Sequence, residues 1–150
     1  MQEQMRCVST IEELDVYSEI VLTGGEPMEH PDYVALMLGA LRMRVPERPI
    51  YLYISKYHHM LIEILPLVDG VTWTVHGQPL WDDTLDFNSF QRIIETLQVK
   101  NSRLLIMARA NARITIKPQL WSRIEYKLPY TEAELVLPKG EELLIWTGRL

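Results

Sequence analysis

Apolar and polar residues follow two different periodicities along the chain, and these periodicities alternate. Continuous β-favouring runs occur at residues 20–23, 50–54, 71–75 and 104–108. Between these runs, apolar residues recur at spacings of three and four, which is typical of amphipathic helices. The spacing predicts helices over residues 10–17, 32–42 and 57–64, and another that begins at Asn88 after a loop over 76–86.

This order of elements predicts an α/β fold built from successive βαβ units around a mostly parallel sheet. The strands are almost continuously apolar, so we expect the sheet to be covered on both faces. The pattern also allows the strand at 104–108 to continue through Ile116. The last part of the chain, 111–150, is harder to place but β-rich, with strands expected at 124–127 and 143–146.

Size and composition predict one globular domain over residues 1–150. The chain is 47% hydrophobic and 23% charged, which is enough apolar material for one core. It has no run of about 18 apolar residues that could span a membrane, and its polar first ten residues do not resemble a secretory signal. With a single cysteine as well, we expect a cytoplasmic protein.

The net charge of −5 is unevenly distributed. Residues 1–32 hold eight acidic side chains and one arginine, whereas residues 100–127 hold seven basic side chains and one glutamate. A basic segment can bind nucleic acid, but this one lacks interleaved aromatic residues and the chain is acidic overall. We therefore expect a solvated basic face, balanced by the acidic end or paired with it between subunits, and we regard nucleic-acid binding as unlikely.

The segment Ile20–Tyr33 combines a strand, a tight turn and the start of a helical pattern. Its turn, Thr23-Gly24-Gly25-Glu26-Pro27, can bring bare backbone close to a ligand. This string resembles the glycine-rich motif of radical S-adenosylmethionine (SAM) enzymes, in which the turn contacts the amino group of the methionine moiety of SAM. The residues that follow, His30-Pro31-Asp32, fit the same resemblance.

The resemblance covers about residues 10–110, because later segments are similar to the next elements of that family. These segments are IYLYIS at 50–55, DGVTWTVHG at 69–77, FNSFQRIIETL at 87–97 and the strand at 104–108. The resemblance implies a truncated partial (β/α) barrel of radical SAM type, with residues 111–150 divergent.

The chain departs from the family in the residues that hold the iron–sulfur cluster. Family members carry three cysteines spaced CxxxCxxC upstream of the glycine-rich turn, and such clusters require thiolate ligands. This chain has only Cys7, and the first strand with its cysteine loop looks absent. We therefore expect no iron–sulfur cluster and no radical chemistry by this polypeptide alone.

The resemblance also indicates which residues would contact the ligand. The turn residues Thr23, Gly24, Gly25, Glu26 and Pro27 are the main candidates for SAM binding. Ser55 and His76, at the carboxyl ends of expected parallel strands, are further candidates, and so are Arg109 and Asn111. Each also has a structural interpretation as a turn residue or, for Glu26, as an acid leading into a helix. No group of residues has metal-ligand spacing, so we assign no metal site.

These observations favour a non-catalytic radical SAM-like binding or interaction module, with SAM or a nucleotide as its candidate ligand. The alternative is a SAM-utilising enzyme, either cluster-independent or one half of a split radical enzyme completed by another chain. An open barrel leaves a sheet edge and a sheet face uncovered, so we expect a homo-oligomer or a covering protein partner.

Overall fold

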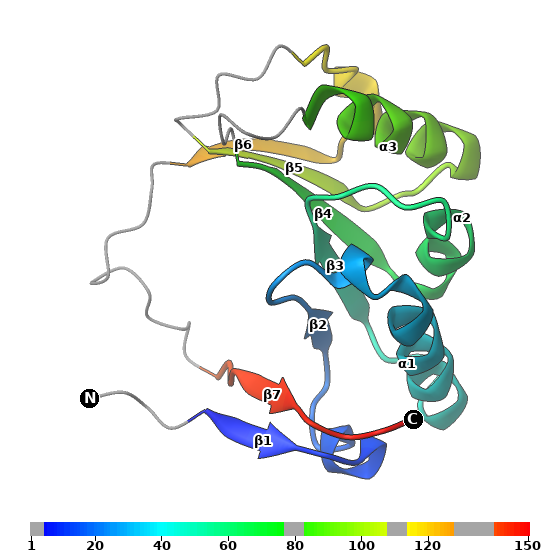
Figure 1. Ribbon diagram of the computed structural model, residues 1–150, viewed down its shortest axis with the longest axis vertical. Coiled ribbons are helices and arrows are strands. Elements are labelled where there is room, and N and C mark those ends of the chain that lie inside the picture. Colours follow the sequence, from blue (N-terminus) through cyan, green and yellow to red (C-terminus); the bar gives the residue numbers. More distant parts are fainter. Residues whose placement is uncertain (1–4, 77–82, 108–113, 128–139) are drawn as a thin grey trace.

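A curved sheet of five parallel strands forms the centre of the protein (Figure 1). The computed structural model describes residues 5–76, 83–107, 114–127 and 140–150. Within these, the sheet has the strand order β2-β3-β4-β5-β6. The strands are β2 (Ile20–Leu22), β3 (Ile50–Ile54), β4 (Gly70–Val75), β5 (Ser102–Met107) and β6 (Arg123–Lys127). The predicted α/β fold with a parallel sheet is therefore confirmed.

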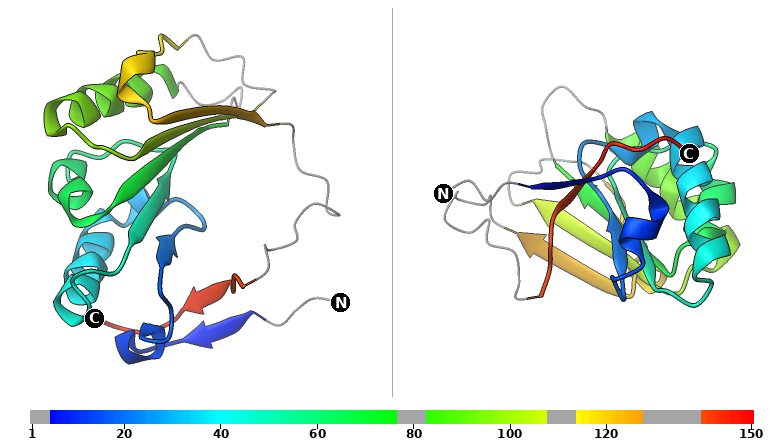
Figure 2. Two further views of the ribbon diagram at one scale, coloured as in Figure 1. Left: turned by 180° about the vertical axis from the view of Figure 1, so that it is seen from behind. Right: turned by 90° about the horizontal axis from the view of Figure 1, so that it is seen from below.

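Three α-helices cover the convex face of this sheet (Figures 1 and 2). They are α1 (Pro31–Arg44), α2 (Leu61–Ile64) and α3 (Asp83–Leu97), accompanied by the 3-10 helices η1 (Ile11–Leu14), η2 (Pro27–Glu29), η3 (Leu65–Leu67) and η4 (Pro118–Leu120). Helix α1 buries Val34, Met37, Leu38 and Leu41, which are the residues that its apolar spacing predicts.

Aromatic side chains form the core between α3 and β4. Trp73 stacks on Phe90 with ring centroids 4.5 Å apart, and Trp121 lies against both Phe87 and Phe90 at 5.9 Å. Trp73, Phe87 and Phe90 have no exposed surface. Trp121 lies two residues before β6, so this cluster packs α3, β4 and the segment that precedes β6 against one another.

A second, two-stranded sheet lies beyond β2, at the end of the molecule opposite to β6 (Figures 1 and 2). Strand β1 (Arg6–Val8) pairs in parallel with β7 (Leu144–Trp146). The Tyr33 hydroxyl of α1 donates to the carbonyl oxygen of Gly148 at 2.7 Å and accepts from the indole N–H of Trp146 at 2.5 Å. The carboxyl-terminal segment is thus attached to α1.

Most predicted elements are confirmed, and the differences have local causes. The expected helix at 10–17 is the short η1, and the helix at 57–64 begins only at Leu61, because the backbone N–H of Met60 donates to the His58 ring instead of continuing a helix. Helix α3 begins five residues earlier than predicted, because Phe87 extends its buried stripe toward the amino end. Residues 114–116 are not in a strand, so the predicted continuation of this strand through Ile116 is wrong for these three residues.

Among the described residues the main sheet begins with β2, so no earlier strand of that sheet precedes the glycine-rich turn, as expected; the strand β1 pairs with β7 instead. The expectation of a sheet covered on both faces is wrong for the described residues, because their α-helices all lie on the convex face (Figure 1). In β3, the buried residues Ile50, Leu52 and Ile54 alternate with Tyr51 and Tyr53, which face the concave side and keep part of their surface exposed.

Among the described residues, the ion pairs of the acidic and the basic segment do not join the two segments to each other. Arg44 of α1 contacts both Asp15 and Glu12, and Arg103 contacts Glu125. No helix in the described ranges is long and apolar enough to cross a bilayer.

Asp69 links the amino ends of β3 and β4, and this role predicts a pH dependence of stability. Its Oδ2 accepts hydrogen bonds from the Ile50 N–H at 2.8 Å and from Arg42 Nη2 at 2.7 Å. Burial tends to raise the pKa of Asp69, but these two donors outweigh burial and hold the pKa below its ordinary value. The ionised carboxylate therefore stabilises the fold above the pKa of the unfolded chain, about 4, and this stabilisation is lost as pH falls through the lower folded pKa.

We therefore expect Asp69→Asn to lower the free energy of unfolding at pH 7 and to lower it less at pH 3. Urea unfolding at both pH values measures the two differences, with the exposed Asp32→Asn as control. A loss of stability in Asp69→Asn that is equal at both pH values would contradict this role.

Candidate ligand-binding site

The turn that follows β2 has a backbone conformation that only glycine adopts easily. Gly24 has φ = 87° and Gly25 has φ = 55°, both in the left-handed region. No heavy atom lies within 4 Å of the position that a Cβ would take at either residue. The two glycines are therefore required by conformation and not by crowding, and the space beside their backbone is open.

Glu26 fastens this turn to the end of the neighbouring strand. Its Oε2 accepts hydrogen bonds from the backbone N–H of Ser55 at 2.8 Å and from the Ser55 hydroxyl at 2.6 Å. Its Oε1 accepts one from the N–H of Met28 at 3.1 Å, which caps the 3-10 helix that Pro27 begins. The carboxylate thus joins the carboxyl ends of β2 and β3 while it ends the turn.

This arrangement gives Glu26 and Ser55 a structural role. An ionised carboxylate offers about four lone-pair sites, and protein donors occupy three of them here. Glu26 is therefore chiefly a positioning residue, with one acceptor site left on Oε1. Ser55 holds Glu26 through both its backbone and its side chain, so its hydroxyl proton is already used.

The remaining predicted site residues are less closely grouped. Thr23 is exposed in the turn itself, and His76 is exposed directly after β4. Because β2, β3 and β4 are parallel, with Leu22 beside Leu52 and Ile54 beside Trp73, His76 lies at the same edge of the sheet as the turn. Arg109 and Asn111 lie outside the described residues.

The residues near this edge do not fit an iron–sulfur cluster. Cys7 is exposed in β1, where it pairs with Ile145 of β7, and it is the only cysteine of the chain. Three thiolates are needed to hold a cluster of the radical SAM kind. In the part of the chain that the structure describes, no group of three or more His, Cys, Asp or Glu residues is arranged to hold a metal ion.

Comparison with known proteins finds no family model, no curated protein and no solved structure that matches this chain.

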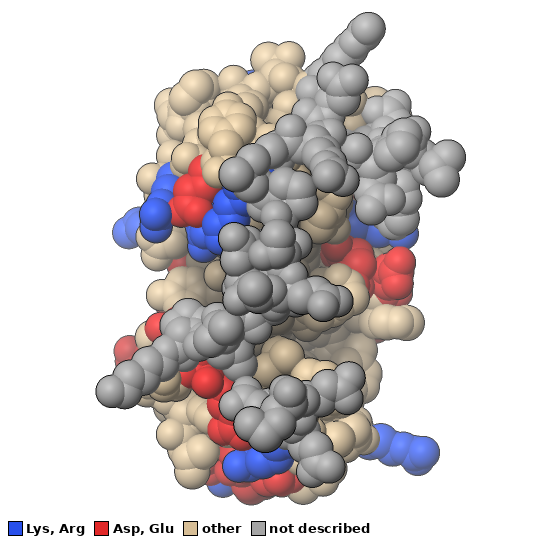
Figure 3. Space-filling model, turned by 90° about the vertical axis from the view of Figure 1, so that its left-hand side faces the viewer, with Lys and Arg blue, Asp and Glu red and all other residues tan. Residues whose placement is uncertain are grey.

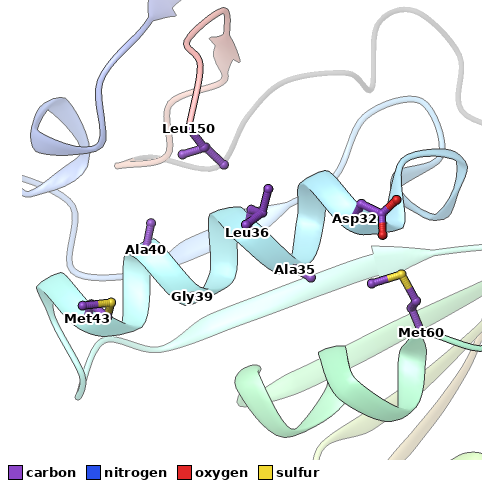
Figure 4. Close-up of a pocket in the computed structure, with 8 residues that line it drawn as sticks. All are labelled: Asp32, Ala35, Leu36, Gly39, Ala40, Met43, Met60 and Leu150. Carbon is purple, nitrogen blue, oxygen red and sulfur yellow. The ribbon is translucent and has the colours of Figure 1, made fainter.

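A hollow in the described surface runs along the outer side of α1 and is almost entirely apolar (Figure 4). It has a volume of about 700 Å³, and Leu36 and Leu150 point toward each other across it. It is lined by Asp32, Ala35, Leu36, Gly39, Ala40, Met43, Met60 and Leu150. None of the predicted site residues lines it.

A second hollow of about 290 Å³ lies on the concave face of the sheet, and the sequence reasoning missed it. Its polar and aromatic side chains include Tyr51, Tyr53, Arg103 and Arg123. The available signal was the alternation within β3, where Ile50, Leu52 and Ile54 alternate with Tyr51 and Tyr53.

Proposed function

We propose that the protein is a non-catalytic ligand-binding module of radical SAM type, and that the turn at Gly24 and Gly25 binds SAM or a related nucleoside. The observation that carries this proposal is the open, left-handed glycine pair at the carboxyl end of β2, held in place by Glu26 and Ser55. In parallel α/β sheets, ligands commonly bind beyond the carboxyl ends of the strands.

The chemistry of the turn suits an ammonium group. The backbone carbonyl oxygens of a glycine turn accept hydrogen bonds, and open space at both Cβ positions allows a ligand to approach the main chain. Glu26 Oε1 keeps one acceptor site for a ligand. The Glu26 carboxylate also places a negative charge beside the turn. The amino group of the methionine moiety of SAM is a ligand group of this kind.

Catalysis through a cluster is not part of the proposal, because Cys7 is the only thiol of the chain. A cluster completed by another chain stays the alternative. Anaerobic reconstitution with iron and sulfide, alone and with proteins encoded nearby, tests it through the visible absorbance of the cluster.

Self-association across the edge strands β2 and β6 also stays a prediction.

A thermal melting screen tests the proposed ligand. At a hundredfold excess over its dissociation constant, SAM should stabilise the fold by about 2.7 kcal/mol, which raises the melting temperature of a chain this long by about 5–10 °C. S-adenosylhomocysteine should act similarly because it keeps the amino acid moiety, whereas 5′-methylthioadenosine, which lacks it, should not.

A matched pair of glycine variants shows whether the turn is responsible. Gly25→Ala places a Cβ at φ = 55°, whereas Gly39→Ala places one in α1, and neither Cβ meets an atom within 4 Å. We expect Gly25→Ala to abolish the shift with SAM and Gly39→Ala to keep it. The proposal fails if SAM does not stabilise the wild-type protein, or if both variants respond to SAM as the wild type does.

A further inference from the structure

The concave face of the sheet carries a row of polar and aromatic side chains that crosses four neighbouring strands. Tyr53 lies beside Thr72, Thr72 beside Arg103, and Arg103 beside Arg123 in the register of β3 to β6. Side chains at paired positions of parallel strands share one face, so these four point to the concave side. Parallel sheets usually bury both faces under apolar residues, and this face departs from that pattern.

This row forms much of the 290 Å³ groove described above. Glu19, Asn101 and Ser122, which come just before β2, β5 and β6, also line it, so the groove opens at the amino ends of the strands. The glycine turn lies at the opposite edge. Along β3, Ser55 lies two residues, or about 7 Å, beyond Tyr53 and four residues, or about 13 Å, beyond Tyr51. Neither the glycine turn nor Ser55 lines the groove, so the groove and the proposed SAM site share no residue.

The groove has an excess of positive charge at its β5–β6 end. Arg103 Nη2 donates to Glu125 Oε2 at 2.7 Å, and Arg123 Nε forms an ion pair with the other carboxylate oxygen. These guanidinium groups hold the pKa of Glu125 below its ordinary value, so the carboxylate is ionised at neutral pH. One carboxylate balances one of the two arginines, which leaves a net positive charge. Figure 3, viewed from the concave side, shows basic side chains around acidic ones in its upper part, at the height of β5 and β6 in Figure 1.

The β2–β3 end of the groove has a different chemistry. Tyr51 and Tyr53 lie two residues apart on β3 and supply aromatic surface, and Val21 of β2 lies beside Tyr51. Glu19 places a negative charge at this end. A bound molecule would therefore put a planar ring against the tyrosines and its anionic group two or three strands away, near the arginines.

We propose that this amino-end groove binds a small anion that carries a planar ring, of the class to which nucleoside monophosphates belong. The ring stacks on Tyr51 and Tyr53, and the phosphate pairs with Arg103 and Arg123. A volume of about 290 Å³ is at the lower end of the range for ligand pockets, which suits one mononucleotide and not a longer chain.

Isothermal titration with AMP tests the proposal, with adenosine and ribose 5-phosphate as the two halves of the probe. We expect AMP to bind with a dissociation constant below about 1 mM and each half to bind more weakly. Arg123→Gln, at an exposed side chain, should weaken AMP binding about tenfold while leaving adenosine unaffected. Tyr53→Leu should weaken both AMP and adenosine.

Glu125→Gln gives the sharpest result, because removing the one carboxylate between the arginines should strengthen AMP binding severalfold. A loss of stability alone would not produce tighter binding. Gly25→Ala should leave AMP binding unchanged, so this experiment is independent of the SAM proposal. Failure of AMP to bind, loss of its binding in Gly25→Ala, or tighter binding of a single-stranded oligonucleotide than of AMP would overturn the proposal.

Discussion

Replacing Phe90 with alanine should lower the free energy of unfolding by about 3–5 kcal/mol, the usual cost of removing a fully buried aromatic ring. Phe90 has no exposed surface and contacts Trp73 on β4 and Trp121 before β6. Its removal would leave a cavity between two indole rings that the backbone holds apart. The substitution should therefore weaken the packing of α3 on the sheet and the packing of the segment that precedes β6.

Equilibrium unfolding in urea measures this effect, and Leu85→Ala is the matched control. Leu85 lies on the same helix but is 70% exposed, so its replacement should change stability by less than about 0.5 kcal/mol. Similar losses in Phe90→Ala and Leu85→Ala would show that α3 does not pack against the sheet as described.

Replacing Glu26 with alanine should have the second large effect, because it removes the acceptor for three protein donors. The N–H groups of Met28 and Ser55 would lose their partner while partly buried, which costs about 1–3 kcal/mol for each group that water cannot reach. The glycine turn would also be released from β3. We therefore expect a clear loss of stability and at least a tenfold loss of SAM affinity.

Thermal melts with and without SAM separate these two consequences. Glu29→Gln is the control, since Glu29 is exposed in the same 3-10 helix and makes only a long ion pair with Lys56 at 3.9 Å. Ser55→Ala removes the hydroxyl donor but keeps the backbone N–H, so its effect should be smaller than that of Glu26→Ala. A Glu26→Ala protein that is as stable as Glu29→Gln would refute the positioning role.

The elements that could be predicted from the sequence are those whose local pattern agrees with their burial. The buried stripe of α1 and the strand Ile50–Ile54 are examples, because apolar spacing directly encodes the face that packs. Strand β1 could not be predicted, because its pairing depends on β7, more than 130 residues away. The early start of α3 depends on packing of Phe87 against Trp73 and Trp121, a tertiary contact.

The candidate site was only partly accessible from sequence. The turn at 23–27 is a contiguous string, and its place at the end of β2 follows from the order of elements. The bond between Glu26 and Ser55 joins residues 29 positions apart and needs the parallel register of β2 and β3. The alternation within β3 indicates a polar concave face, but the position of the groove needs the register of five strands at once.

The most direct test of the account is a titration of ¹⁵N-labelled protein with SAM, followed by amide NMR. We expect the amide signals of Gly24, Gly25 and Ser55 to shift in a saturable way, while those of Tyr51 and Arg103 at the amino end of the sheet stay in place. If no signal shifts at millimolar SAM, or if the shifts occur only away from the glycine turn, the proposed binding function is contradicted.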